Sequence, residues 1–242
     1  MFDLTGKTAL VTGSTQGIGF SIAETFAQNG AKVYVHGATS MEKCKMASEA
    51  VINSVPVMAN LSEDGCADKL YEQTGDVDIL VLNASVQIRG ELENITEEDF
   101  AKQFRTNVLS SMLLVKKYVP YMKEKRYGRI VMIGSVNQYK QNPKLTVYAA
   151  TKAAQMNFVQ TMARELACFG ITVNNIAPGV ILTPRNEAVL RDEEYKAKIM
   201  SGIPAGFAGT PYDIAPAALL LCSEEGRYIT GSDIIIDGGM HL

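Results

Sequence analysis

A phenol and an ammonium group stand four residues apart at Tyr148 and Lys152. On a helix this spacing puts both groups on one face. Taken alone, the pair is typical of an amphipathic helix with a surface lysine. Ser135 follows a predicted strand at 129–133, and open α/β sheets bind ligands at the carboxyl ends of their strands. Asn107 is a polar residue in an apolar helical stretch and needs a partner. We therefore expect these four side chains to meet at a ligand site.

A glycine-rich turn with the spacing G-x-x-x-G-x-G follows the first predicted strand and opens the first predicted helix. Glycines permit a tight turn and let a phosphate approach backbone N–H groups. The helix N-terminus adds free N–H groups and a partial positive charge. A tight turn alone would explain the glycines, but their place between strand and helix favours a dinucleotide site. The turn contains Gly13, Ser14, Thr15, Gln16, Gly17, Ile18 and Gly19.

Short apolar runs alternate with helix-length segments along the whole chain. The runs lie at 8–12, 32–35, 55–59, 78–82, 129–133, 172–176 and 233–236. The helical segments lie at 17–29, 40–50, 62–74, 96–124, 146–169 and 210–223. Several runs are almost wholly apolar, as in strands that are buried on both faces. The alternation predicts an α/β fold, a doubly wound Rossmann-type sheet of seven mostly parallel strands with helices on both faces.

The composition is that of a globular protein, with 242 residues, 47% hydrophobic and 20% charged, and predicts one domain over 1–242. With 23 basic and 26 acidic side chains the net charge is −3, so no nucleic-acid surface is expected. Two histidines, and four cysteines without C-x-x-C spacing, argue against a metal site and a Ser-His-Asp triad. No apolar run approaches the ~20 residues that span a bilayer, and no signal peptide is recognisable. We expect a cytoplasmic protein with reduced thiols.

Taken together, these motifs resemble the short-chain dehydrogenase/reductase family from Lys7 to Met240. The resemblance rests on the glycine turn and on shorter motifs that follow in order at family-like separations. These are Asn83-Ala84, Asn107, Ser135, Tyr148, Lys152, Pro178-Gly179, Tyr228-Ile229-Thr230-Gly231 and Asp237-Gly238-Gly239. Within the family, segments 203–206 and 228–240 are most similar to 3-oxoacyl-[acyl-carrier-protein] reductases.

The resemblance implies hydride transfer between a nicotinamide cofactor and a carbonyl or secondary alcohol. Tyr148 would be the general acid in reduction and the base in oxidation. Lys152 would hold the nicotinamide ribose and lower the pKa of the phenol from near 10 by ~3 units, or ~4 kcal/mol. Ser135 would bind the substrate oxygen, and Asn107 would support a water that relays protons to Lys152.

The resemblance also implies cofactor contacts outside the glycine turn. They are His36, Thr39, Asn60, Leu61, Asn83, Ala84, Tyr148, Lys152, Pro178, Gly179 and Thr183. The chain departs from the family pattern at Leu82 and Ser85, where Asn and Gly are usual, and at Asn60, where Asp is common. Ser85 adds a side chain beside the expected cofactor. Asn60 can still accept a hydrogen bond from the adenine amino group.

The choice of nicotinamide depends on the end of the second predicted strand. A carboxylate there would favour NAD by pairing with the ribose hydroxyls. No acid appears before Glu42, although Gln16 also stands where the family often has a basic residue. Thr39, Ser40 and Lys43 could bind a 2′-phosphate. We therefore favour NADP over NAD.

The substrate stays open at the level of sequence. A 3-oxoacyl thioester, carried on acyl carrier protein, is the substrate that the resemblance favours. A sugar or sugar-acid dehydrogenase of the same family would suit the polar segment 137–142, with Arg89 and Arg185 holding an acid group. A nucleotide-sensing scaffold would not need Tyr148 and Lys152. A methyltransferase could use a glycine turn but has no need of this pair.

Segment 178–209 is irregular and rich in proline and glycine, with a short charged helix expected around 186–200. Long excursions of this kind are usually functional, and we expect a loop or lid over the substrate. The segments 96–124 and 146–169 carry more apolar and small residues than one buried stripe requires. Family members pair these helices with symmetry mates, so the resemblance implies a homotetramer.

Overall fold

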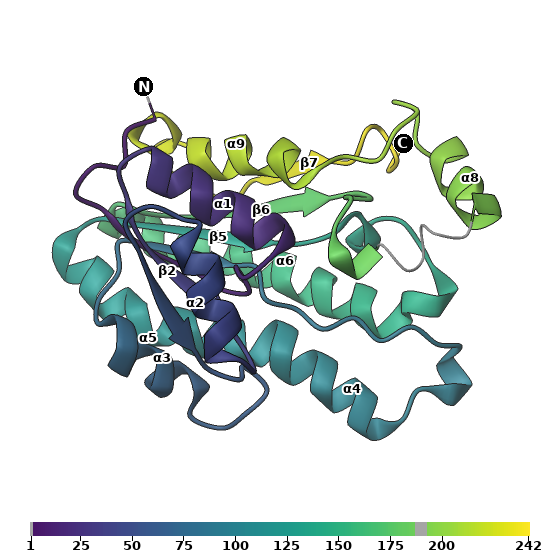
Figure 1. Cartoon of the computed structure of the whole chain (residues 1–242), viewed down its shortest axis with the longest axis horizontal. Helices are drawn as coiled ribbons and strands as arrows, with labels where there is room; N and C mark the ends of the chain where they lie inside the picture. The colour runs from purple at the N-terminus through teal and green to yellow at the C-terminus, as the bar shows by residue number, and fades with distance from the viewer. Residues whose placement is uncertain (1, 187–192) are drawn as a thin grey trace.

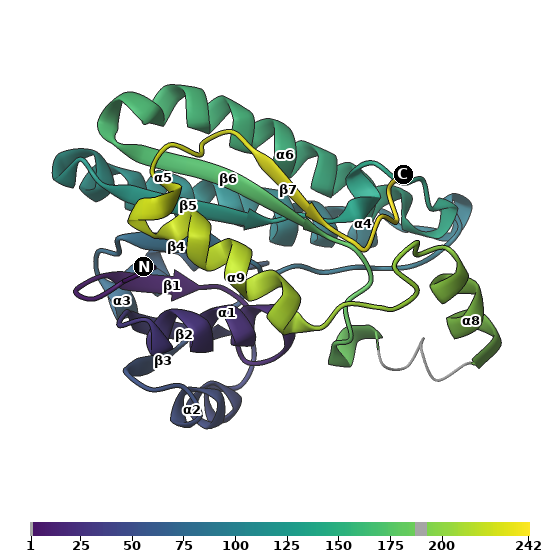
Figure 2. The same cartoon turned by 90° about the horizontal axis from the view of Figure 1, so that it is seen from above.

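Seven strands form one sheet in the order β3-β2-β1-β4-β5-β6-β7 (Figures 1 and 2). The structure is a computed structural model and describes residues 2–186 and 193–242. The strands are β1 (Thr8–Val11), β2 (Lys32–Gly37), β3 (Ser54–Met58), β4 (Ile79–Leu82), β5 (Gly128–Ile133), β6 (Ile171–Pro178) and β7 (Asp233–Ile236). Each strand of this sheet is parallel to its neighbours. The predicted α/β fold is confirmed.

Helices cover both faces of the sheet (Figure 1). One face carries α1 (Gly17–Gln28), α2 (Met41–Glu49) and α9 (Pro211–Cys222). The other face carries α3 (Cys66–Thr74), α5 (Ser110–Lys125) and α6 (Thr146–Leu166), with α4 (Glu97–Phe104) beside α6. The short helix α8 (Glu193–Ser201) lies outside both layers, at the end of the molecule where the C-terminus also lies (Figures 1 and 2).

The central strands contribute side chains to both hydrophobic layers. In β4, Ile79 and Val81 pack in the layer under α1 and α9, whereas Leu80 and Leu82 pack in the layer under α5 and α6. Successive side chains of a strand point to opposite faces, and because both faces of β4 are covered, all of its residues are apolar. The chain reverses its winding direction between β1 and β4, which is where such sheets bind ligands.

The long predicted helix over 96–124 consists of three parts. Thr96 and Asp99 form a reciprocal cap at the start of α4, as the sequence pattern indicates. A π-helical turn at Arg105–Leu109 then separates α4 from α5. Such turns are rare and often occur at functional sites. Sequence periodicity does not reveal this turn because it changes the helical phase by only one residue.

One other predicted helix begins later than expected. The predicted helix at 62–74 starts at Cys66, because Gly65 has a left-handed φ of 70°. Within the helix expected around 186–200, the described part is α8 (Glu193–Ser201); residues 187–192 of that prediction lie outside the described residues. A parallel bridge between Ile181 and Gly209 joins the two ends of the segment that contains α8. None of the helices in the described part of the chain is long and apolar enough to cross a membrane.

Candidate active site

A cavity of about 780 Å³ lies at the carboxyl ends of the strands. Most of the predicted site residues line it, although they come from many different elements. Those that line it are Gly13, Thr15, Gln16, Gly17, Ile18, His36, Thr39, Asn60, Leu61, Asn83, Ala84, Ser135, Tyr148, Lys152, Pro178, Gly179 and Thr183. Three predicted residues, Ser14, Gly19 and Asn107, are absent from this lining. The topology of the sheet therefore brings the predicted site residues to one cavity, and only these three do not line it.

Ser14 and Gly19 support the glycine turn on the side that faces away from the cavity lining. The hydroxyl of Ser14 is buried, donates to the carbonyl of Val11 at 2.6 Å and accepts from the His36 N–H at 2.9 Å. A side chain at Gly19 would place its Cβ 2.5 Å from both the Asn83 amide nitrogen and the Gly13 carbonyl oxygen. The Ser14 hydroxyl and the missing side chain at Gly19 both support the turn, and their predicted cofactor contacts stay predictions.

The glycine turn is held by side chains from the neighbouring strand end. Asn83 Nδ2 donates to the carbonyl oxygens of Thr12 and Gly13, both at 2.9 Å. The hydroxyl of Thr12 accepts from the backbone N–H groups of Asn83 and Ala84. No side chain caps the N-terminus of α1. Backbone N–H groups of its first turn are thus available to an anion in the cavity, and the turn fits a dinucleotide phosphate.

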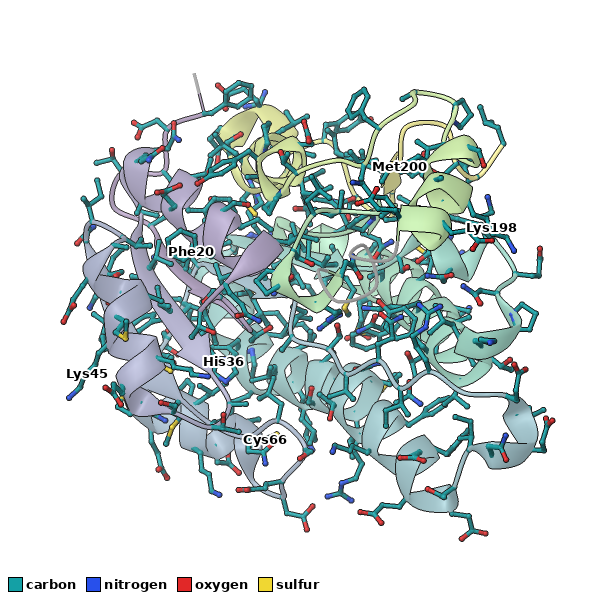
Figure 3. The ribbon with its side chains drawn as sticks, turned by 45° about the vertical axis from the view of Figure 1, so that its right-hand side comes forward. Phe20, His36, Lys45, Cys66, Lys198 and Met200 are labelled. Atoms are coloured by element: carbon teal, nitrogen blue, oxygen red, sulfur yellow. The ribbon has the colours of Figure 1, made fainter. Side chains whose placement is uncertain are left out.

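His36 is the last-but-one residue of β2 and supports the same turn. Its Nδ1 accepts from the Gly13 N–H at 3.0 Å, so this nitrogen carries no proton. Its Nε2 therefore carries the proton and donates to the carbonyl of Ala59 at 2.9 Å. Burial lowers the pKa of His36 to about 4. Both nitrogens bind protein groups, so the ring braces the turn; Figure 3 labels it between Phe20 of α1 and Cys66 of α3.

Tyr148 and Lys152 lie in the first turns of α6 and are 5% and 2% exposed. Lys152 Nζ donates to the carbonyl of Ile133 at 2.7 Å and lies 5.5 Å from the centroid of the Tyr148 ring. Ser135 follows β5, and its oxygen accepts from the backbone and side-chain N–H groups of Asn137. The predicted meeting of phenol, ammonium and hydroxyl is therefore present.

Burial governs the electrostatics of this group. It raises the pKa of Tyr148, while the charge of Arg185 and the hydroxyls of Ser135 and Ser85 act in the opposite direction. Burial, reinforced by Arg185, lowers the pKa of Lys152 to about 7. Arg185 is thus a cation near the phenol that the sequence analysis did not connect with the proton donor. The role of Lys152 in lowering the pKa of the phenol stays a prediction.

Asn107 lies in the π-helical turn and is completely buried. Its Oδ1 accepts from the Val86 N–H at 2.7 Å, and its Nδ2 donates to the Val86 carbonyl and to Thr151 Oγ1. Both amide donors are thus used within the protein. The side chain joins the loop after β4 to α6 and does not line the cavity, so we interpret Asn107 as a positioning residue.

Several cavity residues were not among the expected contacts. Thr106, next to Asn107, lines the cavity with a buried hydroxyl that has no hydrogen-bond partner in the structure. Thr106 lies in the π-helical turn, and because the sequence does not predict this turn, it does not predict the contact of Thr106 with the cavity. Ile199 of α8 and Met240 near the C-terminus also line the cavity. Only the folded chain brings these two residues to the site.

The chain is similar in sequence to known proteins. The family model described as enoyl-(acyl carrier protein) reductase matches residues 13–241. The chain belongs to the short-chain dehydrogenase/reductase family. A 3-oxoacyl-[acyl-carrier-protein] reductase of Haemophilus influenzae is 41% identical over 98% of this chain and 99% of its own length.

Solved structures of family members have the same fold. A 3-oxoacyl (acyl-carrier-protein) reductase from Agrobacterium tumefaciens with NADP bound has a TM-score of 0.94 at 38% identity and covers 98% of this chain and 95% of its own. A gluconate 5-dehydrogenase from Burkholderia cenocepacia, in complex with NADP and tartrate, has a TM-score of 0.91 at 28% identity and covers 99% and 96%. This short-chain dehydrogenase/reductase is an NAD(P)-dependent oxidoreductase that acts between a carbonyl and an alcohol.

Proposed function

We propose that this chain reduces the 3-oxo group of an acyl thioester with NADPH. The observation that carries the proposal is the meeting of Ser135, Tyr148 and Lys152 in one cavity beside the glycine turn. The description of the family model names an enoyl reductase, whereas the relative from Haemophilus influenzae is a 3-oxoacyl reductase. Likeness to that reductase over nearly the whole chain supports the 3-oxo substrate.

The chemistry follows from the three side chains. When bound, the nicotinamide supplies the hydride. The Ser135 hydroxyl donates a hydrogen bond to the substrate oxygen, and the Tyr148 hydroxyl gives that oxygen its proton. Lys152, with a pKa of about 7, exchanges a proton near neutral pH and can restore the phenol. In oxidation the same groups act in reverse, with Tyr148 as the base.

A preference for NADP over NAD is supported by the residues at the end of β2. Thr39 and Lys43 line the cavity there, and the hydroxyl of Ser40 caps the N-terminus of α2. A hydroxyl, an ammonium and a helix N-terminus suit a 2′-phosphate. No carboxylate lines this cavity among the described residues, so none repels that phosphate. Gln16 offers no arginine fork, so we propose a modest preference.

A sugar-acid dehydrogenase is the second candidate. Asn137, Lys140, Gln141 and Asn142 line the cavity and give it a polar wall after β5. A polyol offers hydroxyls to such a wall, whereas a long acyl chain does not. This polar wall is the observation that favours the second candidate.

We propose a homotetramer that works in the cytoplasm. Phe100 of α4, Leu109 of the π-helical turn and Met112 of α5 are exposed apolar side chains, where a second buried surface is expected. All four cysteines are free thiols, which suits a reducing compartment. Light scattering at micromolar concentration is expected to give four times the chain mass. A monodisperse species near 26.3 kDa would contradict the tetramer.

A substrate screen tests the proposed function. Purified protein is mixed with NADPH or NADH and with acetoacetyl thioesters, oxidised sugar acids and simple diketones. We expect cofactor oxidation with the thioesters, and the Tyr148→Phe variant serves as the matched control. Activity with sugar acids alone would favour the second candidate. Cofactor binding without turnover of any carbonyl or alcohol would contradict the proposed function.

A further inference from the structure

The charge around the cavity differs from the charge of the whole chain. The chain has a net charge of −3, yet the described residues that line the cavity include cations and no Asp or Glu. These cations are Lys43, Arg89, Lys102, Lys140, Lys152 and Arg185. Lys43 lies beyond β2, where a cofactor phosphate is expected. Arg185 lies instead where its charge acts on both Tyr148 and Lys152.

Arg185 is fixed by a residue that departs from the family pattern. Its Nη1 donates to Ser85 Oγ at 3.0 Å, and its Nη2 donates to the Ser85 carbonyl at 2.7 Å. The Ser85 hydroxyl also interacts with the hydroxyl of Tyr148. A continuous polar chain therefore runs from the segment after β6, through the loop after β4, to the expected proton donor. Glycine at position 85 would have no side chain to continue this path.

The guanidinium retains capacity for a ligand. It has five N–H donors in a planar fork, and Ser85 uses one on each of two nitrogens. The residue is exposed to the cavity, so burial does not explain its place. A planar pair of N–H donors matches carbonyl-type oxygens, and it matches a carboxylate best.

We propose that Arg185, positioned by Ser85, binds a second oxygen function of the substrate, namely the C1 oxygen of a 3-oxo compound. The source of that oxygen is either a thioester carbonyl or a free carboxylate. This inference rests on the proposed hydride transfer at Tyr148 and makes Arg185 a specificity residue for the same site. It selects substrates with an oxygen-bearing carbon two bonds from the reacting carbonyl carbon over simple ketones.

Three probes test the proposal with NADPH as reductant: S-acetoacetyl-N-acetylcysteamine, acetoacetate and pentan-2-one. Arg185→Met should lower the ratio of kcat/KM for the acetoacetyl probes over pentan-2-one by ~20-fold, mainly through KM, as expected for loss of a charge-assisted hydrogen bond. Ser85→Gly should lower the ratio less, because the guanidinium remains but is no longer fixed. Arg227→Met removes an exposed cation outside the cavity and should leave the ratio unchanged.

The arms of this experiment separate the possible outcomes. Preference for acetoacetate over the thioester identifies a carboxylate as the ligand, and the reverse identifies the thioester carbonyl. An unchanged kcat/KM ratio in Arg185→Met would overturn the proposal. A loss of NADPH affinity in fluorescence titrations that is as large as the fall in this ratio would also overturn it. A wild type that reduces only pentan-2-one would also overturn it and leave hydride transfer intact. No turnover of any of the three probes, together with no activity in the wider screen, would instead refute the proposed function.

Discussion

The two sides of the cavity are built on different principles. On the side of β1 and β2, the glycine turn is held by Asn83, Thr12 and His36 through hydrogen bonds that stay within the protein. On the side beyond β5 and β6, polar side chains such as Lys140 and Arg185 reach the cavity from the segments that follow these strands. The first side presents the backbone of a turn that is braced within the protein, with Thr39 and Lys43 beyond it, and the second presents mainly polar side chains. A braced turn suits an invariant cofactor, whereas side chains that follow the strand ends suit a substrate that differs between enzymes.

The largest expected effect lies where the two sides meet. Tyr148→Phe removes the proton donor and keeps the ring, so turnover should fall by at least ~10²-fold while NADPH binding is retained. Steady-state kinetics and fluorescence titration measure the two quantities. Lys152→Ala should impair both, since Lys152 is expected to serve cofactor and proton transfer alike. Near wild-type turnover in Tyr148→Phe would show that the phenol is not the proton donor.

The cofactor side should be sensitive to acid through His36. The folded pKa of about 4 lies below the ordinary value of 6.5, so the unfolded chain binds the extra proton first as pH falls. The free energy of unfolding should therefore decrease between pH 6.5 and 4, by up to about 3 kcal/mol from this group. Urea unfolding of wild type and His36→Asn across this range measures the difference. Equal slopes in the two proteins would argue against a buried neutral imidazole.

The two sides also differ in what they can discriminate. NADPH should bind more tightly than NADH, but by a modest ratio, because Thr39 and Lys43 supply no bidentate arginine contact. Nicotinamide fluorescence titration gives the ratio, and Lys43→Met should reduce it further. A clear preference for NADH would show that the end of β2 does not accept the 2′-phosphate.

The smallest expected effect concerns motion. The described parts of the segment after β6, 179–186 and 193–209, should exchange amide hydrogens faster than the sheet and slow down when cofactor and substrate bind. Hydrogen exchange with mass spectrometry compares these peptides with peptides of β4 and β5. Equal protection with and without ligands would contradict a lid that closes over the substrate.

The sheet could be predicted because strands that are buried on both faces have short runs of consecutive apolar residues. In β4, four consecutive apolar residues serve two layers, and the turn signals around such short runs distinguish them from helices. The pairing of Tyr148 with Lys152 could be predicted because helical spacing is fixed. Capping by Thr96 could be predicted because the cap is local in sequence.

Other features depend on contacts between distant residues. The role of His36 needs Gly13 and Ala59 on either side of the ring, and neither neighbour follows from the sequence of β2. The contact of Arg185 with Ser85 joins residues 100 positions apart. Within the π-helical turn, Asn107 bonds to α6 and to the loop after β4, and neither partner is near it in the sequence. Local patterns therefore predict the framework and the catalytic pair, but not the side chains that tune them.

The bridge between Ile181 and Gly209 has a consequence for exchanging the segment that lies between these two residues. Leu182 donates to the Gly209 carbonyl, and the Gly209 N–H donates to the Val180 carbonyl, so the two ends of the segment are tied together at its base. Changes in length within a segment whose ends are already joined cost little loop-closure entropy. Replacing residues 184–208 with the corresponding piece of a gluconate dehydrogenase keeps this tie and Thr183, and exchanges the part of the segment that brings Arg185 and Ile199 to the cavity. We expect such a chimera to change its substrate choice and to retain its cofactor.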